Sequence, residues 1–211
     1  MTNRPWVLAT RNAGKLRELR PLFADAGIAV IDLAEAGVPE SLEEETLEHF
    51  DTFEGNALAK ARWFSERVEG LPVVADDSGL EVDALGGAPG VLSKRWSGRT
   101  DLSGAALDAA NNALLVDRLR GVHDRRARFV CAAAWRAGEQ EIAVRGEVMG
   151  RIVEEHESRG AHGFGYDPLF RADELGMTLA EATVAQKQSV SHRGRAFESL
   201  LAALRQLTGQ Q

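Results

Sequence analysis

Short apolar runs alternate with segments of helical periodicity along this chain of 211 residues, and this alternation limits the folds that it can adopt. Residues 6–9 form an apolar run of the kind that a buried parallel strand shows, and a polar turn follows over residues 10–14. Apolar residues then recur at helical spacing up to Phe23, and Pro21 marks the expected end of that helix because proline lacks the N–H donor. This order predicts an α/β protein.

A second helix and strand are expected further along the chain. Asp51 can cap a helix in which Glu54 completes a capping box, and the apolar spacing continues to Val68. The apolar run of residues 73–75 predicts a strand that ends at the polar residues 76–79.

The C-terminal half shows the same kinds of pattern. Residues 102–119 predict a long helix, and residues 127–135 and 141–152 predict a hairpin. Residues 155–168 predict a polar loop. The closing helix has an apolar face formed by Phe197, Leu200, Leu201, Leu204 and Leu207.

The composition excludes several classes of protein. Lys and Arg total 25 against 32 Asp and Glu, and the net charge of −7 disfavours a protein that binds duplex DNA. Cys131 is the single cysteine, which excludes an intrachain disulfide and fits a reducing compartment. No apolar run reaches the about 20 residues of a membrane span. We therefore expect one cytoplasmic domain over residues 1–211, without nucleic-acid or membrane partners.

Residues 10–15 predict a phosphate-binding turn. Backbone N–H groups and the positive end of a helix dipole converge at such a strand-to-helix turn. Thr10 and Asn12 add side-chain donors, Gly14 permits close approach, and Lys15 supplies a cation. The alternative is an ordinary turn in which Asn12 and Gly14 only cap the helix.

Asp76 and Asp77 predict a catalytic or metal-binding site. Adjacent carboxylates at the end of an apolar strand are unfavourable unless they meet a cation or reach solvent. Because successive strand residues point to opposite faces, only one of the pair can face a given site. That one would hold Mg²⁺ or activate water. The alternative is an Asx turn that ends the strand.

Three further segments have chemistry that fits a nucleotide. The glutamates of residues 43–48 offer a carboxylate for a hard cation, or else form a solvated face. The glycine loop of residues 163–168 can stack a planar base on an aromatic ring, or else anchors Phe164 in the core. Lys187 and residues 191–194 gather cations and a histidine before the last helix, for an anionic ligand or as solvated charges. For Cys131, buried packing is expected rather than nucleophilic chemistry.

Six motifs in this order resemble one family, the non-canonical purine nucleoside triphosphate pyrophosphatases. They are ATRNAGK at residues 9–15, FEGNA at 53–57, ADDSGL at 75–80, GGAPG at 86–90, GFGYDP at 163–168 and SHRG at 191–194. The resemblance implies an elongated mixed sheet flanked by helices, two lobes around a deep nucleotide-binding cleft, and a homodimer. It also implies Mg²⁺-dependent hydrolysis of ITP, dITP and XTP to the nucleoside monophosphate and pyrophosphate.

The resemblance also implies roles for individual residues. Asp77 would accept the proton and bind Mg²⁺, Lys15 would assist catalysis, and Glu48 would be the second metal carboxylate, with Glu45 as the alternative. The residues that would contact the substrate are Thr10, Arg11, Asn12, Ala13, Gly14, Lys15, Ser78, Phe164, Gly165, Tyr166, Asp167, Lys187, His192 and Arg193. Arg11 and Gly55 depart from the residues that the family more often carries at these positions.

Elementary chemistry agrees with the implied reaction, and it leaves alternatives. Hydrolysis of a triphosphate needs its charge neutralised and a base within reach of the attacking water. A donor aimed at O6 of a 6-oxopurine would exclude ATP, because an unpaired buried donor costs about 1–3 kcal/mol; it would not exclude GTP. The alternatives are a pyrophosphatase for modified pyrimidine nucleotides and a non-catalytic nucleotide sensor, whereas single-strand nucleic-acid binding has the least support.

Overall fold

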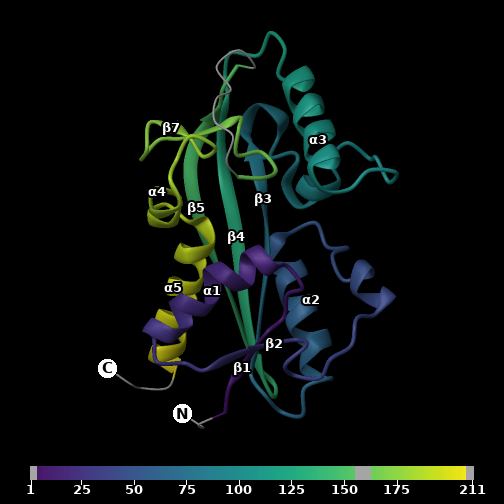
Figure 1. Ribbon diagram of the computed structural model, residues 1–211, viewed down its shortest axis with the longest axis vertical. Helices are drawn as coiled ribbons and strands as arrows, with labels where there is room; N and C mark the ends of the chain where they lie inside the picture. Colours follow the sequence, from purple (N-terminus) through teal and green to yellow (C-terminus); the bar gives the residue numbers. More distant parts are fainter. Residues whose placement is uncertain (1–3, 155–162, 208–211) are drawn as a thin grey trace. The chain divides into compact units, whose positions relative to one another are not determined.

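The computed structural model describes residues 4–154 and 163–207 (Figure 1). A mixed sheet of seven strands in the order β2-β1-β3-β4-β5-β6-β7 is flanked by helices, which confirms the α/β class. Strands β2, β1 and β3 are parallel, whereas β5, β6 and β7 pair antiparallel. No helix in these two ranges is long and apolar enough to cross a membrane.

The strands are β1 (Trp6–Leu8), β2 (Val30–Asp32), β3 (Val73–Val82), β4 (Arg126–Ala137), β5 (Gln140–Ile152), β6 (Phe170–Ala172) and β7 (Met177–Thr178). The α-helices are α1 (Ala13–Asp25), α2 (Phe53–Ser65), α3 (Gly104–Arg118), α4 (Val184–Ser189) and α5 (His192–Leu207). Short 3₁₀ helices are η1 (Leu42–Thr46), η2 (Asp83–Leu85) and η3 (Gly90–Arg95).

The chain forms two compact units, each with its own hydrophobic core. Unit 1 comprises Met1–Asp77, Cys131–Gly146 and Arg193–Gln211, and unit 2 comprises Ser78–Val130 and Glu147–His192. Strands β3, β4 and β5 each continue from one unit into the other. The single domain over residues 1–211 stays a prediction.

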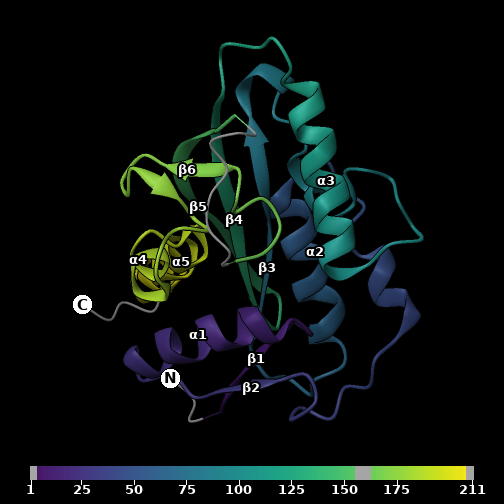
Figure 2. The same cartoon turned by 45° about the horizontal axis from the view of Figure 1, so that its top comes forward.

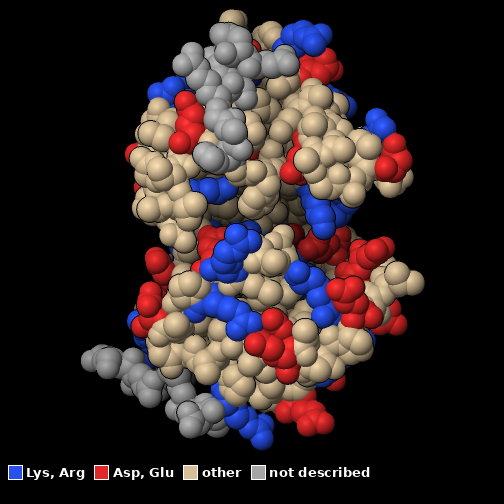
Figure 3. Space-filling model, in the orientation of Figure 1, with Lys and Arg blue, Asp and Glu red and all other residues tan. Residues whose placement is uncertain are grey.

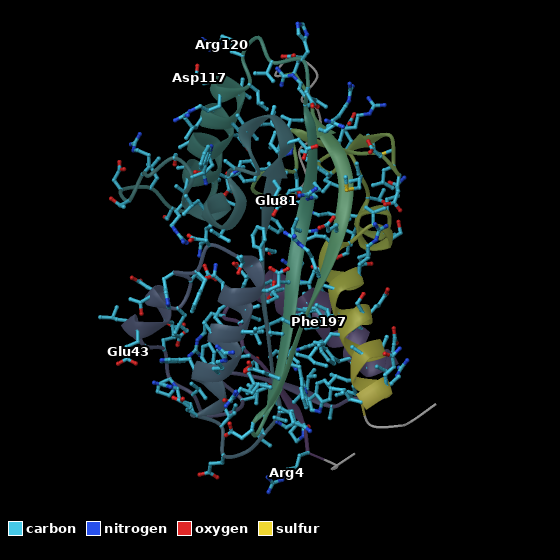
Figure 4. All side chains as sticks on the ribbon, turned by 180° about the vertical axis from the view of Figure 1, so that it is seen from behind. Arg4, Glu43, Glu81, Asp117, Arg120 and Phe197 are labelled. Carbon is cyan, nitrogen blue, oxygen red and sulfur yellow. The ribbon has the colours of Figure 1, made fainter. Side chains whose placement is uncertain are left out.

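In unit 1, helices α1 and α5 lie next to each other against the strands (Figures 1 and 2). The rings of Phe23 from α1 and Phe197 from α5 meet edge to face at 5.6 Å, and Phe197 lies on the side of α5 that faces the strands (Figure 4). The prediction that Pro21 ends the first helix is wrong. Helix α1 continues to Asp25 because Leu19 and Phe23, on either side of the proline, are buried in this core.

The predicted start of the second helix is also wrong. Thr52, rather than Asp51, caps α2, and its hydroxyl oxygen accepts a hydrogen bond of 3.1 Å from the N–H of Gly55. Since position 55 is a glycine, no side chain there returns the second bond of a capping box. The helix ends at Ser65, and Val68 is buried in the turn that follows.

Strand β3 is the largest departure from the sequence prediction. It runs for ten residues and passes directly through Asp76, Asp77 and Ser78, where the sequence predicted its end. The Asx-turn alternative is therefore wrong. The strand can continue because side chains from α1, α2 and α5 solvate the two carboxylates, so burying them is not prohibitive.

In unit 2, Leu115 of α3 and Leu119, which follows the last residue of that helix, pack into a core with Phe129 and Phe170. Helix α3 and the β4–β5 hairpin confirm the two elements predicted there. Strands β6 and β7 and helix α4 were not predicted. Of the predicted polar loop, residues 155–162 lie outside the described residues, and residues 163–168 form turns.

The closing helix is confirmed, with two corrections. Helix α5 starts at His192, so Arg193 lies in its first turn rather than before it. Four of the five predicted apolar residues are buried, but Leu207 is 64% exposed at the end of the helix.

Candidate active site

The two adjacent aspartates of β3 have different partners within unit 1. Asp76 Oδ2 lies 2.7 Å from Lys15 Nζ and 3.1 Å from Arg193 Nε. Asp77 Oδ2 instead accepts a hydrogen bond of 2.9 Å from the amide of Asn56, and Asp77 Oδ1 lies 3.9 Å from Lys60 Nζ. Strand alternation explains this separation, as expected from the sequence.

The surroundings of Asp76 stabilise its ionised form. Burial acts to raise the pKa of Asp76, but the nearby cations Lys15, Arg193 and Lys60 lower that pKa well below its usual range. Burial also lowers the pKa of Lys15, and Asp76 opposes this effect. Arg193 is itself buried and donates a second hydrogen bond of 2.6 Å to Glu18. Asp76 is therefore a buried anion held between two cations.

The surroundings of Asp77 favour its protonated form. Burial raises the pKa of Asp77, and Glu48 adds to this effect, while Lys60 and the hydrogen bond from Asn56 reduce it. The net result is a raised pKa. The Asn56 side chain is fully buried and its oxygen accepts a hydrogen bond of 2.9 Å from the N–H of Phe50. The amide is thus oriented so that its NH₂ group points at Asp77.

Opposite pKa shifts on adjacent carboxylates separate two chemical roles. An environment that keeps one carboxylate charged and raises the pKa of its neighbour is a common arrangement of acid–base sites. Asp77 has the character of a proton acceptor, because a higher pKa makes a carboxylate a stronger base. Asp76 has the character of a permanent counter-ion for Lys15 and Arg193.

Glu48 and Asp77 fit the two-carboxylate metal site that the resemblance implies. Lys60 Nζ lies 2.6 Å from Glu48 Oε1 and also near Asp77, so both carboxylates already meet at one cation. Among residues 4–154 and 163–207 there is no group of three or more His, Cys, Asp or Glu side chains that could hold a metal. Two carboxylates suffice for Mg²⁺ when substrate phosphates complete the coordination. Glu45 is exposed, and the geometry favours Glu48 over it.

The predicted phosphate-binding turn caps α1. The Asn12 side-chain oxygen accepts hydrogen bonds from the N–H groups of Gly14 at 2.8 Å and Lys15 at 3.1 Å. Thr10 Oγ1 accepts one of 3.2 Å from the N–H of Asn12. The capping geometry considered as the alternative is therefore present, and the phosphate role of residues 10–14 stays a prediction. Lys15 is the member of the turn that reaches the aspartate pair.

Arg11 connects the turn to η1 and to the segment before it. Its guanidinium donates to both carboxylate oxygens of Glu44, at 3.2 and 2.8 Å, and to the carbonyls of Val38 and Pro39 at 3.0 and 2.9 Å. These contacts give Arg11 a structural role. A contact between Arg11 and the substrate stays a prediction.

A second group of predicted residues gathers within unit 2. Asp167 Oδ2 accepts a hydrogen bond of 2.9 Å from the N–H of Phe164 and forms an ion pair with Lys187. Lys187 Nζ also lies 4.8 Å from the centre of the Phe164 ring. The alternative in which Phe164 is anchored in the core is wrong, because this side chain is 66% exposed. Tyr166 is the buried ring, and its hydroxyl donates to the carbonyl of Ser93 at 2.8 Å.

His192 stacks on Phe129 with the ring centres 5.1 Å apart, and Ser78 is half-buried in β3. Cys131 is fully buried, and burial together with Asp76 raises the pKa of its thiol far above the usual range. The expectation that Cys131 is not a nucleophile agrees with this environment.

Sequence reasoning missed Asn56 and Lys60 as members of the site. Both lie on α2, four residues apart, so they share one face of the helix. The signal was present: a polar amide and a lysine recur at helical spacing among the apolar residues Ala57 and Ala61, which are buried. A polar residue on the buried face of a helix indicates a polar partner in another segment of the chain.

Comparison with known proteins identifies the family. The model of the Ham1 family matches residues 6–203. This chain belongs to the Ham1 family. A relative from Frankia alni, named dITP/XTP pyrophosphatase, is 49% identical over 205 residues, which is 95% of this chain and 97% of the relative.

Two solved structures are similar to this chain over nearly its whole length. The Ham1 protein of Staphylococcus aureus superposes with a TM-score of 0.81 at 35% identity, covering 96% of this chain and 98% of that one. A nucleoside-triphosphatase/dITP/XTP pyrophosphatase from Mycobacterium abscessus gives a TM-score of 0.76 at 43% identity, covering 96% and 100%. The mixed α/β fold expected from the six motifs is therefore confirmed, whereas the two lobes and the deep cleft stay predictions.

Proposed function

We propose that this Ham1-family chain is a nucleoside triphosphate pyrophosphatase that converts ITP, dITP and XTP to the monophosphate and pyrophosphate. The observation that carries the proposal is the aspartate pair of β3, in which Asp76 is held as an anion and Asp77 has a raised pKa. The similarity to relatives named dITP/XTP pyrophosphatase supports the substrate class.

In this reaction, Asp77 accepts the proton of the attacking water. Asn56 holds one oxygen of Asp77 in a fixed direction, which orients the carboxylate. Lys15 and Lys60 neutralise charge on the phosphate oxygens, an effect that is strong where water is excluded. Asp76 holds the ammonium of Lys15 in place and opposes the lowering of its pKa by burial. Glu48 and Asp77 would hold Mg²⁺, which when bound would offset phosphate charge and lower the pKa of a coordinated water.

The loop of unit 2 contacts the base. The exposed ring of Phe164 offers a stacking face, and Lys187 next to it supplies a donor for an oxygen at the edge of the base. Any base can stack on the Phe164 ring, so stacking alone does not select among bases. Selection against adenine depends on a hydrogen-bond donor that faces O6 of a 6-oxopurine. The Asp167–Lys187 ion pair holds that donor in place.

We further propose a homodimer in the cytoplasm, as the resemblance and the single buried cysteine suggest. On the described part of the face shown in Figure 3, acidic and basic side chains are interspersed rather than gathered by sign. Together with the net charge of −7, this supports a small-molecule substrate rather than a nucleic acid. Light scattering of the purified chain measures the oligomeric state directly, and a monomer would contradict the dimer.

Product analysis tests the proposed function. The purified protein is incubated with Mg²⁺ and ITP, XTP, GTP, ATP or dUTP in parallel, with and without EDTA. We expect pyrophosphate and the monophosphate from ITP and XTP, and loss of turnover with EDTA. Preferred turnover of dUTP would indicate a pyrimidine pyrophosphatase, and ITP binding without turnover would indicate a nucleotide sensor. Either result would overturn the proposal.

A further inference from the structure

One helix of unit 2 holds both backbone polar groups of a single loop residue. Asp108 Oδ2 accepts a hydrogen bond of 2.8 Å from the N–H of Gly165. Asn112 Nδ2 donates one of 2.9 Å to the carbonyl of the same glycine. Asp108 and Asn112 lie four residues apart on α3 and therefore project from the same face. We call these two side chains the α3 clamp.

The clamp fixes the backbone on both sides of Gly165. Its N–H belongs to the peptide that joins it to Phe164, and its carbonyl belongs to the peptide that joins it to Tyr166. Gly165 has a φ of +60°, in the left-handed region that favours glycine. A chain reversal of this kind is defined by the orientation of these two peptides, and the clamp sets both of them.

The clamp orients the backbone segment that carries an exposed aromatic ring. Phe164 is 66% exposed, so core packing does not hold its ring in place. Its backbone is held instead: its own N–H is bonded to Asp167, and the peptide that follows it is bonded to Asp108. An exposed aromatic side chain on a backbone fixed at both peptides is a pre-organised stacking surface.

Helix α3 is itself held in place within unit 2 by core packing and by hydrogen bonds. Leu115 is fully buried in the core of unit 2. On the same helix, Asn111 accepts a hydrogen bond of 2.8 Å from the N–H of Ser97 and donates one of 3.1 Å to the carbonyl of Lys94. The helix thus connects the loop of Gly165 to the segment of η3, and Tyr166 connects them a second time through Ser93.

We propose that Asp108 and Asn112 are positioning residues for base recognition, which hold Phe164 where it stacks on the planar base of the bound nucleotide. This inference rests on the proposed function for the identity of the ligand. Neither residue is a catalytic residue, because the clamp acts through the backbone of Gly165. The clamp therefore affects binding of the base and leaves binding of the phosphates unchanged.

Two products of the proposed reaction separate these effects. IMP carries the base, whereas pyrophosphate has none. Calorimetric titration with each ligand measures the two affinities without requiring turnover. We expect Asp108→Ala and Asn112→Ala to weaken IMP binding about tenfold, the effect of losing one well-placed hydrogen bond to a charged or amide group. Pyrophosphate binding is expected to stay within about twofold of the wild type.

Conservative variants distinguish positioning from general stability. Asp108→Asn keeps an oxygen that can accept from the Gly165 N–H, so it should recover most of the IMP affinity. Asn112→Asp places carboxylate oxygens against the Gly165 carbonyl and should not recover it. The matched control is Asp117→Ala, on the same helix but at its exposed end, where the Asp117 carboxylate forms an ion pair of 3.2 Å with exposed Arg120 (Figure 4). This control should leave both affinities unchanged.

The outcomes separate this inference from the proposed function. A wild type that binds IMP without hydrolysing ITP overturns the proposed function, and the clamp is still tested by the IMP titrations. Unchanged IMP affinity in both alanine variants, or an equal loss of IMP and pyrophosphate affinity, overturns the clamp. If Asp108→Ala does not fold, Asn112→Ala, which removes no charge, carries the same comparison.

Discussion

Lys15 Nζ lies 2.7 Å from Asp76 Oδ2, and Asp76 is only 2% exposed. The lysine expected to neutralise substrate phosphate is thus already the partner of the first aspartate of the pair. Burial lowers the pKa of Lys15, while Asp76 opposes that effect and supports the charged ammonium. Asp76 is therefore engaged by Lys15 and Arg193, and the proposed proton acceptor is its neighbour Asp77.

Asp76→Asn should destabilise the protein by about 3 kcal/mol at pH 7, because it removes the buried anion that Lys15 and Arg193 share, although Arg193 keeps its ion pair with Glu18. The pKa of Asp76 is lowered in the folded state from an ordinary value of 3.8, so its contribution to stability is present above that pH. It is lost as the pH falls through the lower folded pKa. Urea denaturation at pH 7 and pH 3 should therefore show a smaller difference between variant and wild type at pH 3. An equal difference at both values would contradict this account.

Asp77→Asn should remove nearly all turnover without lowering stability. The pKa of Asp77 is raised in the folded state, mainly by burial, so its ionisation opposes folding as the pH rises above 3.8. Asparagine removes that opposition, and at pH 7 the unfolding midpoint should be equal to or above that of the wild type. The loss of a general base should reduce kcat about 10³-fold. The matched comparison is Asp76→Asn at the adjacent position, since of the two variants only Asp76→Asn should lower the unfolding midpoint.

Lys60→Met should move the acid limb of the kcat/KM profile to higher pH. The ammonium of Lys60 reduces the pKa of Asp77, and without it Glu48 and burial raise that pKa further. A base with a higher pKa becomes deprotonated only at higher pH. The profile is measured from pH 5 to 9.

The control for Lys60 is Arg62→Met on the same helix, which removes an exposed ion pair with Glu141. Surface pairs contribute little, so its profile should match that of the wild type. An acid limb that stays in place in Lys60→Met would show that Lys60 does not act on Asp77.

Phe164→Ala should raise KM for ITP about tenfold with a smaller change in kcat. Base stacking on an aromatic ring contributes about 1–3 kcal/mol by alanine substitution. Val184→Ala, in α4 of the same unit and 75% exposed, removes a comparably exposed apolar side chain and should have no effect. Equal KM values for the two variants would remove Phe164 from the base site.

The elements predicted correctly are those with local signals. Periodicity alone was sufficient for α3, the β4–β5 hairpin and α5, because each is long enough to repeat its pattern. Strands β6 and β7, of three and two residues, are too short to show any pattern. Tyr166 is buried and Phe164 is exposed, although the two lie two residues apart. Contacts with distant segments decide which ring is buried, so the local sequence could not predict it.

The course of β3 could not be predicted from its own residues. Local propensity ends a strand at two adjacent aspartates, yet β3 continues because Lys15, Arg193 and Asn56 supply partners from other parts of the chain. The same contacts create the site. For this reason the sequence located Asp77 and Lys15 as candidates but did not reveal Lys60, whose role depends on the meeting of α2 with β3.

Hydrolysis of ITP in ¹⁸O-labelled water is the most direct test of the central claim. Attack of water on the α-phosphorus places the label in IMP, whereas attack on the β-phosphorus places it in pyrophosphate. We predict label in IMP alone with the wild type, and no labelled product above background with Asp77→Asn. Label in pyrophosphate or in inorganic phosphate, or wild-type labelling by Asp77→Asn, would contradict the account.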